Sequence, residues 1–494
     1  MRVLLIYPEC PDTFWGFKHA LKFISRKAAQ PPLGLLTVAA MLPEHWEKRL
    51  VDLNVTRLKE SDLKWAELVF ISAMSIQKPS AKEVIARCKR AGVKTVAGGP
   101  LFTVEYEDFR EDVDYLVLNE AEVTLPPFLS DLERGEAKPI YTSSEYLKLA
   151  ATPIPLWELV DLKKYATMNL QYSRGCPFDC EFCDISLLYG RKVRTKSKEQ
   201  MVSELDALYA RGWRGDVFIV DDNFIGNSNK LLGSVLPAII DWSEERKRPF
   251  NFLTEVSIDI ADNDELMEQM IHANFSAVFI GIETTHDNSL TECNKMQNAN
   301  RDLLLSVKKI QSAGLRVMAG FIVGFDSDPP TIFERISTFI QDSGIVSAMV
   351  GLLNAPRDTK LYQRLENEGR LLDEFDGDST VLSMNFVPRM DRSTLIEGYK
   401  KIVRRIYASS AYYERVRRFL KEHRPRRSKA ARLKISHLQA VPKSVILLGI
   451  LGKERLHYWH LFFWTLFRRP RLIPLALTLA IYGFHFRKFF EAHI

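Results

Sequence analysis

Two series of short apolar segments, each interrupted by helix-like stretches, constrain the fold of this 494-residue chain more than any other feature. The first series occupies residues 3–7, 49–53, 68–74, 94–99 and 114–118. Alternation of strands and helices at this spacing predicts a Rossmann-like domain over residues 1–145, with a parallel sheet and helices on both faces. Ligands of such sheets bind at the carboxyl ends of the strands, where Ser72, Met74, Gly98, Gly99 and Pro100 lie.

A second series begins after residues 146–166, a segment that contains prolines and that we expect to be a linker. Its apolar segments are residues 168–173, 216–223, 251–258, 277–283, 316–324 and 347–354. Six strand–helix units predict a partial (β/α)6 barrel of the TIM type over residues 167–370, with its chemistry at the carboxyl ends of the strands. Polar residues gather at those ends: Cys176, Asp221, Asp222, Glu255, Ser257 and Glu283. The fold class is therefore α/β, followed by a helical region over residues 371–494.

Three of the six cysteines, Cys176, Cys180 and Cys183, lie within eight positions directly after the first barrel strand. A short loop with this spacing can bring three thiolates to one inorganic centre. A structural zinc site needs four protein ligands, and no other Cys or His lies within 80 residues of the triad. A [4Fe–4S] cluster held by only three cysteines leaves one iron open to a substrate or cofactor.

The other cysteines, Cys10, Cys88 and Cys293, are expected to be buried as small hydrophobic residues. Few cysteines in a long chain, without a secretory signal, favour a reducing compartment over a disulfide scaffold. We therefore expect a cytoplasmic protein.

Charge is distributed unevenly along the chain. Residues 401–494 contain 21 Lys and Arg but 4 Asp and Glu, whereas the remaining 400 residues contain 47 and 58. A basic region on an acidic body indicates an anionic partner, either a membrane surface or nucleic acid, with a solvated helical face as the alternative.

Two apolar stretches in the basic region, residues 456–467 and 472–486, are shorter than the ~20 residues that span a bilayer. Aromatic-rich, Arg-flanked helices of this length are typical of segments that lie in the membrane interface. Packing on the barrel or in a dimer is the alternative. We expect peripheral contact with the cytoplasmic membrane and no nucleic-acid partner.

The segment GCPFDCEFC, residues 175–183, resembles the signature of the radical S-adenosylmethionine (SAM) superfamily, with Phe182 as the aromatic residue before the last cysteine. The resemblance implies that the three cysteines hold a [4Fe–4S] cluster whose open iron chelates SAM. Electron transfer from a donor such as flavodoxin or ferredoxin would cleave SAM to a 5′-deoxyadenosyl radical. The same resemblance places SAM contacts at Phe182, Asp221, Asp222, Glu255, Ser257, Glu283, Gly320, Ile322, Val323 and Phe325.

The amino-terminal segments PPLGLLTVAAMLPE, RLVDLN, ISAMSIQ, VAGGP and LNEAE resemble motifs of the cobalamin-binding domain in the cobalamin-dependent radical SAM class. This resemblance implies cobalamin at Ser72, Met74, Gly98, Gly99 and Pro100. The segments MVGLLNAPRDTKLYQRLENEGRLL and YASSAYYERV resemble the subgroup that contains the hopanoid C-2 methylase. One departure is the absence of Asp-x-His-x-x-Gly, the motif whose histidine ligates cobalt. Either cobalamin binds without a protein histidine, or the domain has lost the cofactor.

The leading hypothesis from the resemblance is a cobalamin-dependent radical SAM methyltransferase acting on an unactivated carbon of a lipid or similar hydrophobic substrate. Ring formation, carbon–carbon coupling or rearrangement without methyl transfer is the alternative. A third class is an RNA-binding or RNA-modifying protein whose basic region contacts phosphates.

Overall fold

The computed structural model describes residues 1–146, 148–372, 377–378, 380, 382–424 and 435–494, with only the backbone for 435–439. The amino-terminal domain is built on a parallel sheet of strand order β2-β1-β3-β4-β5-β6. Its strands are β1 (Arg2–Tyr7), β2 (Glu47–Asp52), β3 (Leu68–Ser72), β4 (Lys94–Gly98), β5 (Tyr115–Val117) and β6 (Ile140–Tyr141). The parallel sheet expected from the sequence is confirmed, with the short β6 as an addition at its edge.

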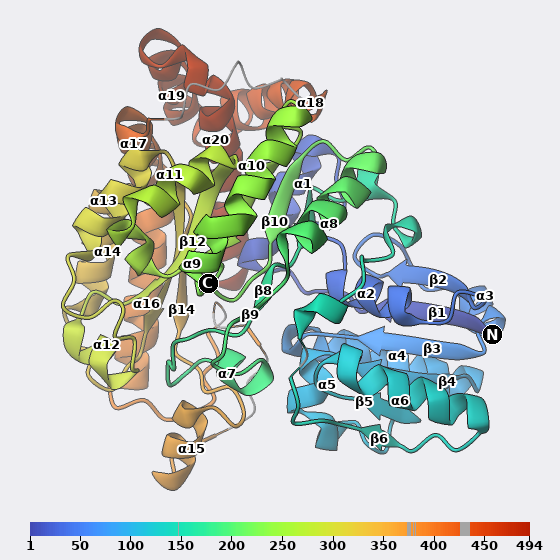
Figure 1. The fold of residues 1–494 in the computed structure, drawn as a ribbon. Coiled ribbons are helices and arrows are strands. Elements are labelled where there is room, and N and C mark those ends of the chain that lie inside the picture. The colour runs from blue at the N-terminus through green and yellow to red at the C-terminus, as the bar shows by residue number, and fades with distance from the viewer. Residues whose placement is uncertain (147, 373–376, 379, 381, 425–434) are drawn as a thin grey trace.

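Helices cover both faces of this sheet (Figure 1). They are α2 (Leu33–Met41), α3 (Glu60–Trp65), α4 (Lys78–Ala91), α5 (Pro100–Val104) and α6 (Ala121–Arg134). Alternate residues of β1 enter different cores, because successive side chains of a strand point to opposite faces. Val3 and Leu5 pack with α2 and α6, and Leu4 and Ile6 pack with α3, α4 and α5.

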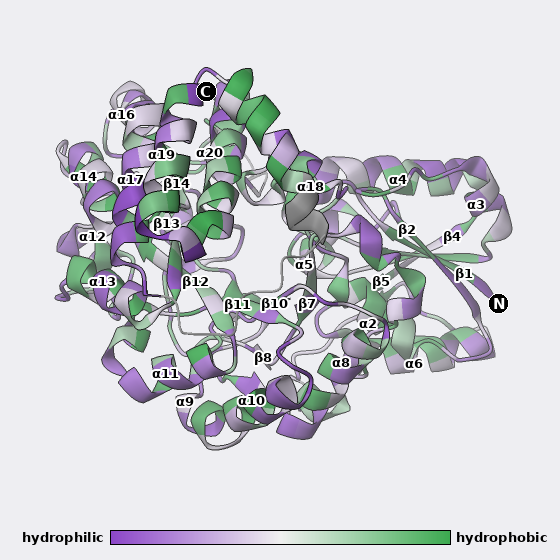
Figure 2. Cartoon of the chain, turned by 90° about the horizontal axis from the view of Figure 1, so that it is seen from above, coloured by the Kyte–Doolittle hydropathy of each residue, from purple (hydrophilic) through white to green (hydrophobic). Residues whose placement is uncertain are grey.

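The second domain is the expected partial barrel, with six parallel strands in the order β14-β13-β12-β11-β10-β7. The strands are β7 (Thr167–Leu170), β10 (Asp216–Ile219), β11 (Asn251–Glu255), β12 (Phe275–Glu283), β13 (Arg316–Val323) and β14 (Ala348–Leu352). Helices lie outside the arc of strands (Figure 2). They are α8 (Lys198–Ala210), α9 (Ser228–Lys230), α10 (Leu236–Glu245), α11 (Asp264–His272), α12 (Asp287–Glu292), α13 (Leu303–Ala313) and α14 (Ile332–Ser343).

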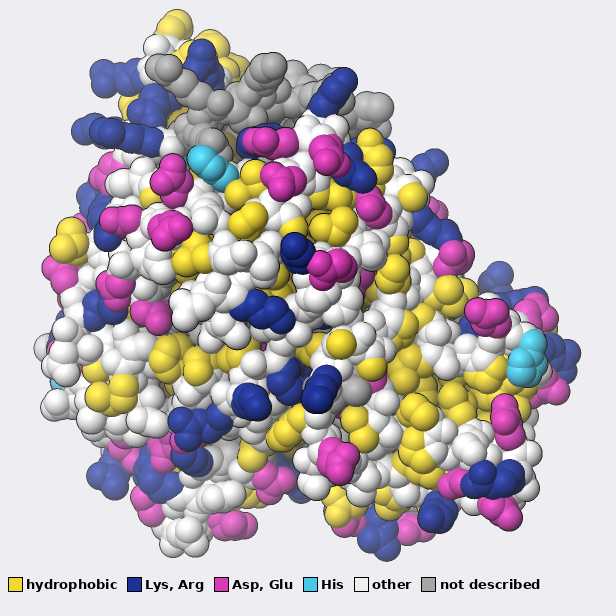
Figure 3. Space-filling model, in the orientation of Figure 1, with side chains coloured by type: hydrophobic (Ala, Val, Ile, Leu, Met, Phe, Trp, Pro, Cys, Tyr) yellow, Lys and Arg dark blue, Asp and Glu magenta, His cyan; other side chains and the backbone are white. Residues whose placement is uncertain are grey.

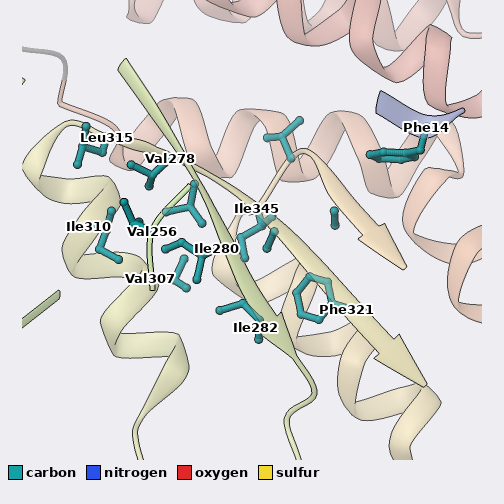
Figure 4. Packing of buried hydrophobic residues seen from close by; sticks show 14 of the residues in the cluster. Phe14, Val256, Val278, Ile280, Ile282, Val307, Ile310, Leu315, Phe321 and Ile345 are labelled. Atoms are coloured by element: carbon teal, nitrogen blue, oxygen red, sulfur yellow. The ribbon is translucent and has the colours of Figure 1, made fainter. Parts of the chain in front are cut away.

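The barrel strands pack against these helices through every second residue. Val278, Ile280 and Ile282 of β12 are fully buried and point towards Val307 and Ile310 of α13 (Figure 4). The intervening residues of the same strand therefore face the barrel interior.

The first and last parts of the chain pack together along the open side of the barrel. In the described part of the chain, β7 and β14 end the sheet and do not pair with each other. Residues 26–31 run beside β7, with a bridge between Ala28 and Tyr165. The preceding segment, which includes α1 (Lys18–Leu21), packs on the carboxyl-terminal helix α20 (Ile473–His493), where Phe14 stacks on Phe486 with ring centroids 4.3 Å apart.

The remaining carboxyl-terminal helices are α15 (Lys360–Asn367), α16 (Arg392–Tyr407), α17 (Ser409–Glu422), α18 (Ile435–Ser444) and α19 (Arg455–Arg468). Helices α17 to α20 gather at the end of the barrel opposite the cysteine loop (Figure 1). Much of the 472–486 segment is buried. This segment therefore packs on the body of the protein, which was the alternative to a helix in the membrane interface. Among the described helices, we find none with the length and apolarity needed to cross a membrane.

In the expected linker, residues 146–166, the described residues 148–166 form short turns and contribute the buried Trp157 to the core. Among the other cysteines, Cys88 and Cys293 are buried as expected, whereas Cys10 is half-buried. Cys10 lies at the carboxyl end of β1 and lines a cavity, which corrects its expected role as a core residue.

Candidate functional site

One cavity of about 2040 Å³ connects the carboxyl ends of the two sheets. Pockets that hold one drug-sized ligand measure roughly 300–1,000 Å³, so this cavity has room for more than one large ligand. The amino-terminal domain contributes Ser72, Met74, Gly98, Gly99 and Pro100 to its wall. The barrel side contributes Arg174, Asp184, Tyr189, Asp222, Glu255, Arg357 and Tyr362.

The Gly98–Gly99 pair packs too closely against its neighbours to carry side chains. Gly99 has a φ of +92°, and a Cβ there would lie 2.6 Å from Ser72 Oγ. A Cβ on Gly98 would lie 2.5 Å from the Val117 carbonyl oxygen. Met74, beside them, is 53% exposed despite its apolar side chain. All five residues predicted to contact cobalamin line this cavity, so they could reach one large ligand bound there.

The three cysteines lie between β8 (Ser173–Arg174) and α7 (Ile185–Leu188), in a loop that follows β7. Gly175 turns the chain into this loop with a φ of +89°, where a Cβ would lie 2.8 Å from the Gly190 carbonyl oxygen. On its other side, the Glu181 amide donates to the Cys293 carbonyl oxygen at 2.9 Å. Arg364 of α15 donates to both carboxylate oxygens of Glu181 at 2.6 and 3.1 Å. The loop is thus held at several points.

All three thiols are free, with Cys180 buried and Cys176 and Cys183 half-buried. Burial raises the pKa of Cys176 and of Cys183, and the nearby charge of Cys180 raises the pKa of both further. Three cysteines on one short loop, without a histidine, are the donor types that hold an iron–sulfur cluster, so the chemistry of these residues fits one. Among the described residues, no three His, Cys, Asp or Glu side chains form a ready-made ion site.

Asp221 anchors the strand before the cysteine loop. Its carboxylate accepts hydrogen bonds from the Tyr172 amide at 2.7 Å, the Ser173 amide at 2.8 Å and the Ser173 hydroxyl at 2.6 Å. Asp221 is 2% exposed and does not belong to the cavity wall. Its neighbour Asp222 does line the cavity, while accepting from the Gly175 amide at 2.9 Å. Of the two acids predicted to contact SAM, Asp222 lines the cavity and Asp221 does not.

Two acids that face the cavity have perturbed pKa values. Burial raises the pKa of Asp222 to about 6 and that of Glu255 to about 8. The charges of Asp222 and Asp221 contribute to the shift at Glu255. A positive charge nearby would stabilise the ionised carboxylates of Asp222 and Glu255 and lower their pKa values again. This part of the wall therefore suits a cationic or amine-bearing ligand.

The other proposed SAM contacts, Phe182, Ser257, Glu283, Gly320, Ile322, Val323 and Phe325, do not line the cavity. Glu283 has a φ of +62° at a register shift between β12 and β13, and it pairs with Lys295 at 2.8 Å. Ser257 exchanges hydrogen bonds with Asn223 at 3.1 and 3.2 Å. Phe182 packs against Phe325 with ring centroids 6.2 Å apart. A contact between SAM and any of these seven residues therefore stays a prediction.

Buried ion pairs join the two domains next to the cysteine loop. Arg174 of β8 donates to the two carboxylate oxygens of Glu122 on α6 at 2.7 and 3.0 Å and lies 3.3 Å from Glu120. Arg194 donates to Glu120 at 2.7 and 2.8 Å. Burial alone would raise the pKa of Glu122, but the hydrogen bonds and charge of Arg174 hold it below the usual value. This cluster fixes the amino-terminal domain relative to the cysteine loop.

The sequence reasoning missed Arg174, Glu122 and Lys295. Arg174 had a local signal, because it directly precedes Gly175 and Cys176 in QYSRGC. Glu122 ends the segment LNEAE, which carries a resemblance to the cobalamin-binding domain but no sign of a pairing with Arg174, and Lys295 lies in no motif. Only the tertiary fold brings them to the site.

Comparison with protein families assigns models to three parts of the chain. Residues 23–129 match the B12 binding domain, residues 170–340 match the radical SAM superfamily, and residues 359–494 match a domain of unknown function. The chain is 42% identical to an uncharacterised methyltransferase of Synechocystis sp., over 99% of this chain and 92% of that protein. It is 33% identical to the hopanoid C-2 methylase of Rhodopseudomonas palustris, over 93% and 88% of the two chains.

Two solved structures share the fold at low sequence identity. The cobalamin-dependent SAM radical enzyme OxsB, with aqua-cobalamin and SAM bound, superposes with a TM-score of 0.61 at 16% identity, over 100% of this chain and 84% of that chain. The radical SAM methyltransferase TsrM of Kitasatospora setae, with cobalamin and a [4Fe–4S] cluster bound, gives a TM-score of 0.58 at 14% identity, over 74% and 75%.

Proposed function

The chain belongs to the cobalamin-dependent radical SAM methyltransferase family, and we propose that it methylates an unactivated carbon of a polycyclic lipid. Its cofactors are those of the family: a [4Fe–4S] cluster, SAM and cobalamin. The observation that carries the proposal is the single cavity that joins the open wall of the amino-terminal sheet to the acidic wall beside the cysteine loop. When bound, these groups supply a radical that removes hydrogen from carbon and a methyl group that replaces it.

In this proposal, each wall of the cavity has its own task. Cys176, Cys180 and Cys183 hold the cluster, and Asp222 and Glu255 orient the positively charged SAM. The surface around Gly98 and Gly99 receives the flat face of cobalamin. The ion pairs of Arg174 keep the two walls at a fixed separation, since a radical reaction needs its partners held close and oriented.

The proposed lipid substrate is supported by the relatives and by the lining of the cavity. The 33% identical relative is, by its name, a methylase of hopanoids. Large apolar side chains dominate the part of the cavity inside the barrel: Trp15, Phe218, Leu253, Phe279, Met318 and Met349. Such a lining excludes water and suits a hydrocarbon skeleton.

We further propose that the region around α19 docks on an anionic membrane. We call this surface the apolar–basic patch, and its exposed apolar residues are Ile446, Leu447, Ile450, Leu451, Leu456, Phe463, Leu466 and Phe467. Residues 441–471 contain six Lys and Arg and one acid, Glu454, which is buried and pairs with Arg487 at 2.6 Å. Figure 3 shows Lys and Arg side chains beside hydrophobic ones at this end of the molecule. Exposed apolar residues ringed by basic ones are typical of interfacial membrane binding.

The function is tested with reconstituted full-length protein, SAM carrying a labelled methyl group, and vesicles that contain a hopanoid. We expect label in the lipid and bound cobalamin in the protein, both dependent on the family cofactors. Cys180→Ala should abolish iron loading and SAM cleavage while leaving cobalamin bound. Lipid-dependent SAM cleavage without methyl transfer would instead support ring formation, coupling or rearrangement.

Membrane docking is tested by sedimentation with vesicles of phosphatidylcholine, with and without phosphatidylglycerol. Leu456→Glu combined with Phe467→Glu removes two residues that are 80% and 81% exposed. Withholding two large apolar side chains from the bilayer should cost roughly 3 kcal/mol, about a hundredfold in binding. Leu305→Glu, at a 66% exposed position on α13, is the control and should bind as the unmodified protein does. Equal losses in both variants would contradict the proposed patch.

A further inference from the structure

Resting on the proposed lipid substrate, we infer that the lipid enters through the interior of the barrel. Its entrance lies at the amino-terminal ends of the strands, beneath the carboxyl-terminal helices and opposite the cysteine loop. The inference depends on three observations: a hollow barrel, a cavity end lined by α18 and α20, where we place the opening, and a buried Arg316 Nε without a hydrogen-bond partner among the described residues at that end.

The barrel interior is hollow. In most (β/α)-barrels, layers of inward-facing side chains fill this space. Here one inward residue from each of five neighbouring strands lines the cavity: Phe218, Leu253, Phe279, Met318 and Met349. Gly320 of β13 leaves room for the inward-facing Phe279 ring, because a Cβ at Gly320 would lie 3.1 Å from that ring. The cavity therefore continues between the strands instead of ending at their carboxyl ends.

The cavity extends to the opposite end of the strands. Its lining includes the first residues of β10 and β13, Asp216 and Arg316, and the second residue of β12, Ser276. Carboxyl-terminal residues complete the lining at this end: Ala440 of α18 and Thr478, Ile481 and Tyr482 of α20. From Arg316 to Val323, β13 spans about 23 Å at roughly 3.3 Å per residue, which separates this opening from the cysteine loop.

This opening adjoins the apolar–basic patch. Helix α18 leads into the patch, and α19, which carries its most exposed residues, packs directly on α20. A lipid that leaves a membrane docked on the patch would therefore meet the opening without crossing the aqueous face between the domains. The cavity is then a path from the bilayer to the radical site.

Polar groups at the opening determine the orientation of the lipid. Arg316 lies 5.9 Å from the Tyr482 ring centroid, and its buried Nε has no hydrogen-bond partner among the described residues. A buried guanidinium nitrogen without an acceptor is costly, so a polar group of the ligand is its natural partner. An amphiphilic lipid would thus place its apolar end near the cysteine loop and its polar end at Arg316.

The test narrows the opening in the full-length, cofactor-loaded enzyme. Thr478→Trp fills the opening from α20, and Thr478→Val is the matched control of unchanged size. Vesicles of equal parts phosphatidylglycerol and phosphatidylcholine that contain a hopanoid are the substrate. We expect Thr478→Trp to raise the KM for the lipid about tenfold or more, with SAM cleavage in the absence of lipid unchanged. A second block from another element, Ser276→Phe with Ser276→Ala as control, should behave in the same way.

The outcomes separate this inference from the proposed function. If the unmodified enzyme methylates the lipid and both blocked variants match it, the route through the barrel is wrong and the function stands. If the unmodified enzyme cleaves SAM but methylates no lipid, the proposed function itself fails. If Thr478→Trp also loses SAM cleavage, Ser276→Phe decides alone.

Orientation is tested with Arg316→Met, with Arg316→Lys as the control that keeps the charge. Arg316→Met should raise the KM for a hopanoid with a hydroxylated tail and leave the KM for one with a hydrocarbon tail unchanged. Equal effects on both lipids would overturn the assigned orientation.

Discussion

Replacing Glu122 by alanine tests whether the buried ion pairs between the domains hold the two halves of the site together. Arg174 is 9% exposed, so its charge is largely shielded from water. After the change, the ion pair with Glu120 at 3.3 Å is the one that remains of those described for Arg174. Removing one partner of a buried pair costs roughly 3–5 kcal/mol, and the remaining contact favours the lower end. We expect a loss of about 3 kcal/mol in domain docking, equivalent to about a hundredfold in its equilibrium constant.

Amide hydrogen exchange measures this loss directly. Peptides that contain the start of α6 and the hairpin of β8 and β9 (Arg194–Thr195) should exchange about a hundredfold faster, because local opening becomes less costly. The ratio of methylated lipid to SAM cleaved should fall, since the reacting groups are no longer held in register. Glu133→Ala, at an exposed position on the same helix, is the control.

A double variant separates the ion pair from general damage. Replacing Glu122 and Arg174 together by leucine removes both charges, so it should destabilise docking less than Glu122→Ala alone. If amide hydrogen exchange in Glu122→Ala is as slow as in the unmodified protein, the pair between Glu122 and Arg174 does not hold the two domains together.

Three further predictions concern other parts of the molecule. Asp221→Ala should deprive two buried backbone amides of their acceptor, at a cost of about 1–3 kcal/mol each, and should lower the iron content of the purified protein. Asp222→Asn should keep the iron but weaken SAM binding. The opposite pattern would make Asp221 the SAM contact. Gly99→Ala should lower the cobalamin content of the purified protein, while Gly135→Ala, with a φ of +74° but no neighbour within 4 Å, should not. Burial lowers the pKa of His485 to about 4, below its unfolded value, so the unfolded state binds more protons and stability falls as pH drops from about 6.5 towards 4. At pH ~5 this costs about 2 kcal/mol, so His485→Gln should make melting less sensitive to acid, and an unchanged pH profile would contradict this.

The sequence by itself determined the fold class and was enough to propose the cluster site. Strand and helix periodicity is a local property, so the segments at 3–7, 68–74 and 316–324 indicated β1, β3 and β13 before any contact was known. The cysteine triad is equally local, because one short loop holds all its members. Alternation also placed Gly98 and Gly99 at a strand end, where parallel sheets bind their ligands.

Only the tertiary structure decided which of two adjacent acids faces the cavity. Asp221 and Asp222 follow the same strand and look equivalent in sequence, but the twist of the chain directs one to the backbone of the cysteine loop and the other to the cavity. It also decided that most of residues 472–486 pack inside the protein, because burial depends on partners such as Phe14 that are more than 400 residues away. The hollow barrel and the ion pairs between domains likewise arise from contacts between distant segments, which no local pattern encodes.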